Sequence, residues 1–226
     1  MNENTIVISL GGSIVVPDEI NASFLKGFES LIRKISQTKK IILVVGGGKT
    51  ARRYIDSLKN FEIDDVQKDW IGIMATRLNA QLVKSIFNDI ASEKVVYDPE
   101  KDIKFEKRVL VAAGYKPGWS TDYVASLLAV KFNANTLINL SNIYYVFDKD
   151  PNKWSDAVRL EKTDWETMQK IVGTEWKPGL NAPFDPVATK LCREKKLKVI
   201  ITNGTDLENL SEILNDREGK CTKIEN

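Results

Sequence analysis

Three consecutive glycines, Gly46 to Gly48, lie in a cationic stretch of sequence that suits a phosphate group. They follow the apolar segment Ile41–Val45, whose mainly β-branched residues predict a strand buried on both faces. Because glycine is unfavourable inside helices and strands, three in a row predict a sharp turn or a close backbone approach. Lys49, Arg52 and Arg53 follow at the expected start of a helix, where backbone N–H groups attract anions. The stretch therefore predicts a phosphate-binding turn, with a tight β–α packing turn as the alternative.

Two familiar nucleotide-binding motifs fit this stretch poorly. A Walker A loop needs a glycine at the position that Leu43 occupies. The dinucleotide fingerprint is formally satisfied by Gly46, Gly48 and Ala51, but it also requires a second strand that ends in an acidic residue about 20 positions later. Residues 60–68 are polar and have no strand core. A nicotinamide-dependent oxidoreductase is therefore a weak alternative.

Two further loops of similar character follow predicted strands. Gly11-Gly12-Ser13 comes directly after Thr5–Leu10, and residues 114–122 come after Val109–Ala112. The second of these loops ends in a Ser-Thr-Asp sequence, which can cap the following helix or hold a phosphate. Because the carboxyl ends of parallel strands meet at one edge of a sheet, we expect the three loops to form one ligand-binding surface.

The chain alternates between strand and helix patterns, which predicts an α/β fold with a mainly parallel sheet and helices on both faces. The polar residues Asp69, Arg77 and Asn79 interrupt a long helical pattern, and sequence alone favours a solvated face for them. A loop is expected from Gly173 to Pro183. The other predicted strands are Lys94–Tyr97, Thr136–Leu140, Tyr144–Phe147, Lys198–Thr202 and, at an edge, Cys221–Ile224; the predicted helices are Asn21–Ser36, Ala51–Leu58, Asp64–Ile90, a segment beginning near Val124, Thr163–Val172, Asp185–Glu194 and Asp206–Leu214.

The totals exclude several classes of protein. The formal net charge of +2 over 226 residues gives no support for a nucleic-acid partner. No apolar run approaches the roughly 20 residues of a membrane span, and a strand predicted almost at the N-terminus argues against a secretory leader. Cys192 and Cys221 have no metal-site spacing, so a reducing, cytoplasmic location is expected. The absence of histidine removes Ser-His-Asp and Cys-His catalysis and most zinc chemistry.

The sequence resembles the amino acid kinase superfamily and, within it, the UMP kinases of the archaeal type. The matching motifs occur in the family order and cover nearly the whole chain. We therefore expect one amino acid kinase domain over residues 1–226, a three-layer α/β/α sandwich. The motifs are Gly11-Gly12-Ser13, Gly46-Gly47-Gly48 with Arg52, Asp69 with Gly72-Ile73, Thr76-Arg77, Asn79-Ala80, Pro117-Gly118-x-Ser120-Thr121-Asp122, Ser141-Asn142 through Asp150-Pro151, and Phe184-Asp185-Pro186 with Ala188 and Lys190.

The resemblance implies transfer of the γ-phosphoryl group of ATP to UMP with Mg²⁺, in pyrimidine nucleotide biosynthesis, by a homohexamer. It implies that the N-terminal part mainly binds UMP and phosphate and that the C-terminal part mainly binds ATP. Arg52 and Lys190 are the implied catalytic residues, and no protein ligand to the metal is implied. The implied ATP contacts are Gly12, Ser13, Gly48, Arg52, Ser141, Asn142, Phe147 and Asp150; the implied UMP contacts are Gly47, Asp69, Lys116, Pro117, Gly118, Trp119, Ser120, Thr121 and Asp122.

The chain departs from the family pattern at three places. Ser9 stands where many members carry a lysine, which leaves Lys49 as a second candidate beside Lys190 for the catalytic lysine. Tyr144-Tyr145 replaces an Asp-Gly pair near the ATP pocket, and Trp119 replaces a smaller or imidazole side chain. The alternatives are a sibling kinase, such as isopentenyl phosphate kinase, whose site usually needs a histidine, and a non-catalytic nucleotide-binding or storage protein.

Overall fold

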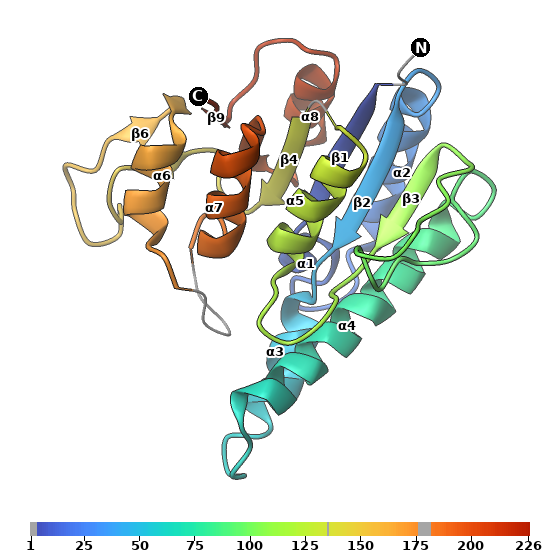
Figure 1. Cartoon of the computed structure of the whole chain (residues 1–226), viewed down its shortest axis with the longest axis horizontal. Helices are drawn as coiled ribbons and strands as arrows, with labels where there is room; N and C mark the ends of the chain where they lie inside the picture. Colours follow the sequence, from blue (N-terminus) through green and yellow to red (C-terminus); the bar gives the residue numbers. More distant parts are fainter. Residues whose placement is uncertain (1–3, 135, 176–181) are drawn as a thin grey trace.

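The computed structural model describes residues 4–134, 136–175 and 182–226, and its centre is a seven-stranded sheet (Figure 1). The strand order is β3-β2-β1-β4-β8-β9-β7, and every neighbouring pair is parallel except β8 and β9. The chain adds β2 and β3 on one side of β1 and then crosses to β4 on the other side, so the topology switches at β1. The strands are β1 Thr5–Leu10, β2 Lys40–Val45, β3 Val109–Ala112, β4 Thr136–Ser141, β7 Lys162–Thr163, β8 Val199–Asn203 and β9 Thr222–Ile224.

Helices cover both faces of this sheet because its central strands are apolar on both sides. Successive side chains of a strand point to opposite faces, so Ile6 and Ile8 join one core while Val7 joins the other. The first core is closed by α2 (Ala22–Ile35), α4 (Asp65–Ile86) and α8 (Leu207–Leu214), and the second by α5 (Thr121–Lys131), α6 (Trp165–Val172) and α7 (Pro186–Lys195). The predicted three-layer α/β/α architecture is confirmed.

Most of the described helices begin at a side chain that accepts a hydrogen bond from the first turn. The exceptions are α1 (Gly12–Val15) and α3 (Gly48–Asp56), which both begin inside glycine loops. Their first turns therefore lack the side-chain cap that the other helices have. The capping residues are Asn21, Asp64, Ser120, Asp164, Asp185 and Asp206.

Several predicted elements need correction. The segment predicted as strand 94–97 only bridges β3, through Val96 and Ala112. The helix predicted from Ala51 begins three residues earlier, because the end of the glycine loop forms its first turn, with Gly48 at a positive φ of 61°. The long helix ends at Ile86 rather than Ile90.

The sequence patterns also missed short elements. The helix α1 and the strands β6 (Arg159–Leu160) and β7 are too short for a periodic signal, and β6 pairs with β5 (Val146–Phe147) in a small second sheet. Because β7 lies outside β9, the C-terminal strand is not at the edge of the sheet as predicted. Most of the loop predicted from Gly173 to Pro183 lies outside the described residues.

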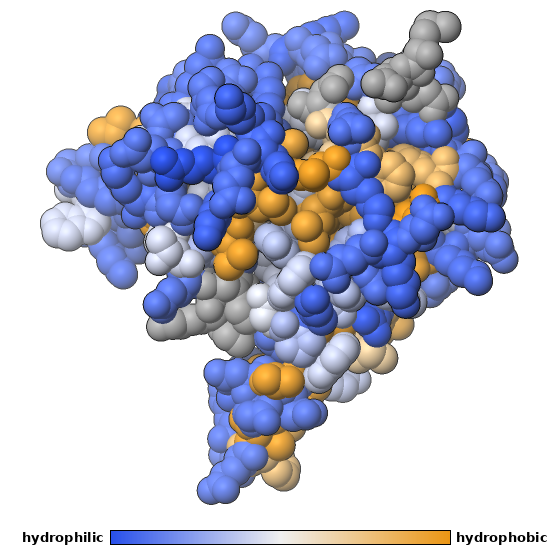
Figure 2. Space-filling view, viewed as in Figure 1, coloured by the Kyte–Doolittle hydropathy of each residue, from blue (hydrophilic) through white to orange (hydrophobic). Residues whose placement is uncertain are grey.

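Helices α3 and α4 extend together beyond the end of the sheet (Figure 1). Their outer surface exposes apolar side chains among polar ones, and Figure 2 shows hydrophobic residues on this protruding end. Met74 and Leu78 of α4 are exposed by 58% and 65%, and Tyr54 of α3 is also exposed. Even α4 does not qualify as a membrane span, and the same is true of every other helix in the described ranges.

The glycine loops after β1 and β2 pack backbone against backbone. A Cβ atom on Gly12 would lie 2.1 Å from the backbone nitrogen of Gly48 and 2.5 Å from the carbonyl carbon of Gly46. A Cβ atom on Gly48 would lie 2.1 Å from the carbonyl oxygen of Gly12. Real Cβ atoms do not approach backbone atoms so closely. Two adjacent strands can therefore end in touching loops only because these positions have no side chain.

We predict that Gly12→Ala lowers the free energy of unfolding by about 3 kcal/mol, because the new methyl group overlaps rigid backbone on the neighbouring loop. Gly118→Ala is the matched control. Gly118 has a positive φ of 84° but open space around its Cα, so alanine there should cost only about 1–2 kcal/mol of backbone strain. Urea unfolding of both variants measures the difference, and equal losses would contradict the proposed overlap.

Candidate active site

The loops after β1, β2, β4 and β8 meet at the carboxyl edge of the sheet, around the point where the topology switches. The backbone N–H of Gly46 donates to the carbonyl of Leu10 at 3.0 Å, which ties the second glycine loop to β1. Gly11 donates to the carbonyl of Leu140 at 3.0 Å, and Gly204 donates to that of Ser141 at 2.9 Å. Ligands of open α/β sheets bind in the crevice at such a switch point. The predicted meeting of the loops after β1 and β2 is therefore present, and the loops after β4 and β8 join them.

Asn79 of α4 supports the second glycine loop with two hydrogen bonds. Its Nδ2 donates to the carbonyl oxygens of Gly46 at 2.9 Å and Gly47 at 3.1 Å, and the side chain is only 3% exposed. The expectation of a solvated face is wrong for this residue. Its amide occupies two carbonyl acceptors, which fixes the orientation of the peptide groups that open α3.

The same helix holds the loop after β3. The backbone N–H of Gly114 donates to Thr76 Oγ1 at 2.8 Å, and Arg77 Nη2 donates to the carbonyl of Tyr115 at 3.1 Å. The guanidinium of Arg77 also lies 4.7 Å from the ring of Tyr97. Arg77 therefore has a structural role as well, contrary to the solvated face expected for it. One helix thus sets the spacing between the glycine loop and residues 114–120.

Asp69, the third polar residue of α4, also contacts this loop. Its Oδ2 accepts a hydrogen bond from the backbone N–H of Gly118 at 2.8 Å. Partial burial raises the pKa of the Asp69 carboxyl, while that hydrogen bond opposes the rise. The expectation of a fully solvated face is wrong here too, since this side chain is half-buried between α4 and the loop.

The segment predicted to surround UMP, residues 116–122, runs from β3 into the first turn of α5. Trp119 packs edge to face against Tyr115 and Tyr123, and the Lys116 ammonium lies 4.1 Å from the Trp119 ring. Lys116 also pairs with Glu100 at 3.5 Å. Aromatic contacts therefore order this loop and occupy the Lys116 ammonium. The other predicted residues are Pro117 and Gly118 in the turn, Ser120 as the cap of α5, and Thr121 and Asp122 in its first turn.

The predicted cations differ in how they are held. Lys49 and Arg53 both lie near Asp18, at 3.6 and 3.9 Å. Arg52 is exposed on the first turns of α3 and makes no ion pair within the described part of the chain. Lys190 is exposed on α7, likewise without an ion pair among the described residues. Of the cations beside the glycine loop, Arg52 is thus the one left available for an anion.

The predicted ATP residues divide between the glycine loops and one cavity. Gly12 and Ser13 open α1, and Gly48 opens α3. The cavity, of about 270 Å³, lies beyond the end of β4 and is lined by Ser141, Asn142, Phe147 and Asp150 together with Tyr145. The four residues that the family resemblance assigned to the ATP nucleoside therefore line one cavity.

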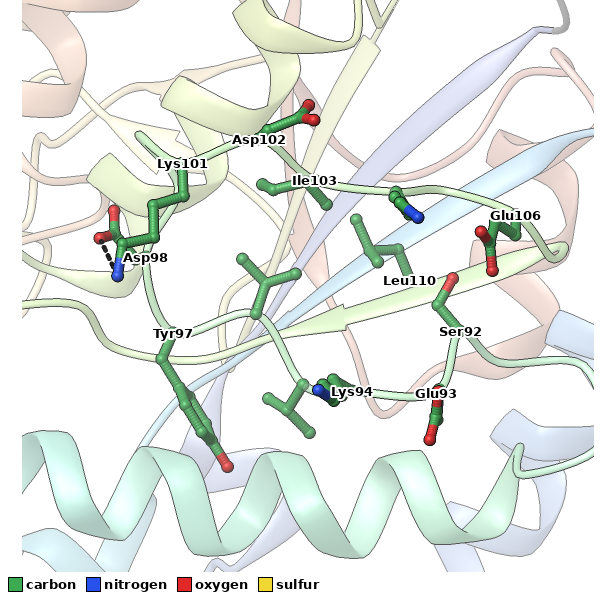
Figure 3. Close-up of a pocket in the computed structure, with 13 residues that line it drawn as sticks. Ser92, Glu93, Lys94, Tyr97, Asp98, Lys101, Asp102, Ile103, Glu106 and Leu110 are labelled. Atoms are coloured by element: carbon green, nitrogen blue, oxygen red, sulfur yellow. Dashed lines mark ion pairs between the residues drawn. The ribbon is translucent and has the colours of Figure 1, made fainter.

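A larger cavity, of about 710 Å³, lies at the outer edge of β3 (Figure 3). It is lined by residues 92–98, 101–104, 106 and 110, and it contains none of the predicted site residues. Two isolated bridges join this segment to β3, one between Ala91 and Val109 and one between Val96 and Ala112. The segment advances five residues between the bridges while β3 advances three, so the segment bulges away from β3 and leaves this space. Tyr97 points from its rim toward α4 (Figure 3). The larger cavity is separate from the glycine loops.

Residues 4–203 match the amino acid kinase family. The chain belongs to this family. It is 38% identical to the uridylate kinase of Thermoplasma volcanium, over 100% of this chain and 99% of that protein, and 34% identical to the uridylate kinase of Methanobrevibacter smithii, over 94% and 96%. The crystal structure of uridylate kinase from Archaeoglobus fulgidus matches with a TM-score of 0.82 at 33% identity, covering 97% of this chain and 99% of that one. The predicted kinship with archaeal uridylate kinases is confirmed.

Within this family pattern, the sequence interpretation missed the partners of Asp122. Ser9, which stands where many members of the amino acid kinase family carry a lysine, donates its hydroxyl to Asp122 Oδ1 at 2.8 Å. Asn139 of β4 donates to the same oxygen at 2.9 Å. Burial raises the pKa of Asp122 to about 6, the two hydrogen bonds oppose the rise, and the nearby carboxylate of Asp185 adds to it. No cation is among the groups that shift this pKa, so the charged carboxylate of Asp122 is stabilised only by neutral hydrogen-bond donors.

We predict that Asp122 makes the stability of the protein depend on pH. Because the folded state holds this proton more tightly than an unfolded chain with a pKa near 3.8, its contribution is fully present below that pH and is lost as the pH rises through about 6. The free energy of unfolding of the wild type should fall by about 2 kcal/mol relative to Asp122→Asn between pH 4 and pH 7. Urea unfolding across this range tests it, and parallel curves for the two proteins would contradict it.

Proposed function

We propose that the chain transfers the γ-phosphoryl group of ATP to UMP and produces UDP and ADP. The observation that carries this proposal is the meeting of two helix starts that have no side-chain cap, at Gly12 and Gly48, with Arg52 on the second of these helices. Backbone N–H groups, together with a guanidinium that has no ion pair among the described residues, suit the oxygens of two phosphate groups brought end to end. Full-length relatives that are uridylate kinases support UMP as the acceptor.

The proposed donor and acceptor sites lie on opposite sides of the glycine loops. ATP would place its phosphates at Gly12, Ser13, Gly48 and Arg52 and its nucleoside in the cavity after β4, at Ser141, Asn142, Phe147 and Asp150. UMP would lie toward α4 and α5, with Gly47 at its phosphate and Asp69 at its ribose, enclosed by residues 116–122. We propose that both sites belong to one domain over residues 1–226, the N-terminal part binding UMP and the C-terminal part binding ATP.

The proposed reaction needs positioning and charge neutralisation more than proton transfer. The attacking oxygen belongs to the phosphate of UMP, whose second pKa is about 6, so it is largely deprotonated at neutral pH. A general base is therefore unnecessary, which agrees with a chain that has no histidine. We assign neutralisation of the transferred group to Arg52 and Lys190, since the Lys49 ammonium lies beside Asp18.

We propose that Mg²⁺ enters with ATP and neutralises charge on its phosphates. The described side chains contain no group of three or more acidic or sulfur ligands suited to a metal ion. Mg²⁺ commonly keeps waters and substrate phosphates as its main ligands, so a site of this kind fits the chain without a dedicated cage. We name no protein ligand. Both cysteines are free, and we place the enzyme in the cytoplasm with its nucleotide substrates.

A coupled ADP-release assay with ATP and Mg²⁺ tests the proposed function, run on UMP, CMP, dUMP and isopentenyl phosphate in parallel. Turnover confined to UMP is the expected result. Turnover of isopentenyl phosphate instead would identify a sibling kinase of the same family. No turnover from a protein whose melting temperature still rises with ATP or UTP would identify a nucleotide-binding protein.

We predict that Arg52→Ala lowers kcat by about 100-fold and changes the KM for UMP by less than about threefold, because the guanidinium acts on charge that develops during transfer. Arg53→Ala is the matched control, since Arg53 lies on the same turn but next to Asp18. Steady-state kinetics with both substrates varied gives the two constants. Equal losses in kcat and in UMP binding would assign Arg52 a structural role.

We also propose that the chain assembles into oligomers, a hexamer by its family resemblance, and that the protruding face of α3 and α4 takes part. This face exposes large apolar side chains around a groove lined by residues of both helices, and such patches are unusual on monomers. The most exposed members are Tyr54, Phe61, Val66, Trp70, Met74 and Leu78.

We predict that the double variant Met74→Glu, Leu78→Glu sediments as a smaller species than the wild type, because two buried charges in an interface would be unpaired. Val158→Glu is the control, because Val158 is 58% exposed but lies next to β6, outside α3 and α4. Sedimentation velocity measures the masses. An unchanged mass for the double variant would exclude this face as an essential interface.

A further inference from the structure

We infer that Tyr145 determines how this chain binds its phosphoryl donor, by presenting its ring as a stacking surface for the donor's base. The inference rests on the proposed function, because it takes the cavity after β4 as the donor site. It concerns a residue that the family pattern does not supply, since glycine is usual at this position. The chain replaces the usual Asp-Gly pair by Tyr144 and Tyr145.

The two tyrosines serve different partners. The hydroxyl of Tyr144 donates to Asp206 Oδ2 at 2.9 Å, and Asp206 is the residue that caps α8. Lys220 lies 5.5 Å from the Tyr144 ring. Tyr144 therefore fastens the segment to α8 and is absent from the cavity lining, whereas Tyr145 contributes to that lining. The first tyrosine of the pair is structural, and the second faces the donor site.

The ring of Tyr145 is held in place from the second sheet. The guanidinium carbon of Arg159 lies 5.1 Å from the centre of the ring. Arg159 is fixed in turn, because it sits opposite Phe147 in the β5–β6 ladder and pairs with Glu161 at 2.9 Å. A ring positioned before the ligand arrives loses little conformational entropy on binding.

The chemistry of the cavity suits a nucleobase. Tyr145 and Phe147 provide aromatic surface, while Ser141, Asn142 and Asp150 provide polar groups for base edges and ribose hydroxyls. At about 270 Å³ the cavity is smaller than the 300–1,000 Å³ of typical ligand pockets. It can therefore enclose the base, with the triphosphate extending outside toward the glycine loops. Stacking on an aromatic side chain is available to every base, because every base has a π face.

The test compares Tyr145→Ala, which removes the ring, with Tyr145→Phe, which keeps it, and with Tyr144→Phe as the control outside the cavity. We expect Tyr145→Ala to raise the KM for ATP by about 5- to 150-fold with kcat and the KM for UMP within about twofold of wild type. Tyr145→Phe should keep the KM for ATP within about twofold. Tyr144→Phe should lower the melting temperature through the lost Asp206 contact and leave both KM values unchanged.

An unchanged or lower KM for ATP in Tyr145→Ala would overturn the inference, because the ring would then contribute nothing to ATP binding or would hinder it. Equal increases in the KM for ATP and the KM for UMP would also overturn it, because they would indicate general damage to the fold. Calorimetric titration of ATP and Mg²⁺ into wild type and Tyr145→Ala, without UMP, separates this result from the proposed function. Wild-type protein that binds ATP but does not turn over UMP would refute the kinase, while the affinities would still decide the role of Tyr145.

Discussion

The backbone contact between Gly12 and Gly46–Gly48 is the constraint on which the candidate site depends. Neighbouring strands lie only about 4.8 Å apart, so loops that leave the ends of β1 and β2 must touch unless they diverge. Here they touch, and a single Cβ atom at Gly12 would overlap both Gly46 and Gly48. The contact brings the starts of α1 and α3 together without side-chain caps. Two helix starts thereby form one surface, which suits the proposed reaction between two phosphate groups.

The long helix α4 links this arrangement to the proposed acceptor side. Asn79 fixes the carbonyls of the glycine loop, Thr76 and Arg77 fix the loop after β3, and Asp69 reaches Gly118 from the same helix. Because one rigid element makes all these contacts, the two loops keep a fixed separation. Loops held in this way need no rearrangement as charge develops, and such preorganisation is the main way in which a protein stabilises phosphoryl transfer.

The charge state of Asp122 follows from its burial and from its neutral hydrogen-bond partners. Ser9 and Asn139, from the two strands at the topological switch, donate to one oxygen of this carboxyl, and its pKa rises to about 6 because burial outweighs those hydrogen bonds. A lysine at the position of Ser9 would favour the charged form instead. In the proposed reaction the positive charge is assigned instead to Arg52 on α3, together with Lys190 on α7, both of which are exposed and without an ion pair within the described ranges.

Local signals in the sequence determined the α/β class and most of the elements. The strands Thr5–Leu10 and Val109–Ala112 have the predicted bounds, and Asp206 caps the predicted helix, because buried strands and caps are encoded within a few residues. The family motifs grouped the residues of the cavity after β4. Tertiary structure alone decided that Asn79 supports the glycine loop and that Ser9 contacts Asp122, 113 positions away. It also decided that Tyr144 bonds to Asp206 while Tyr145 lines the cavity after β4. Those outcomes depend on which distant segments become neighbours, and neither hydrophobic periodicity nor capping carries that information.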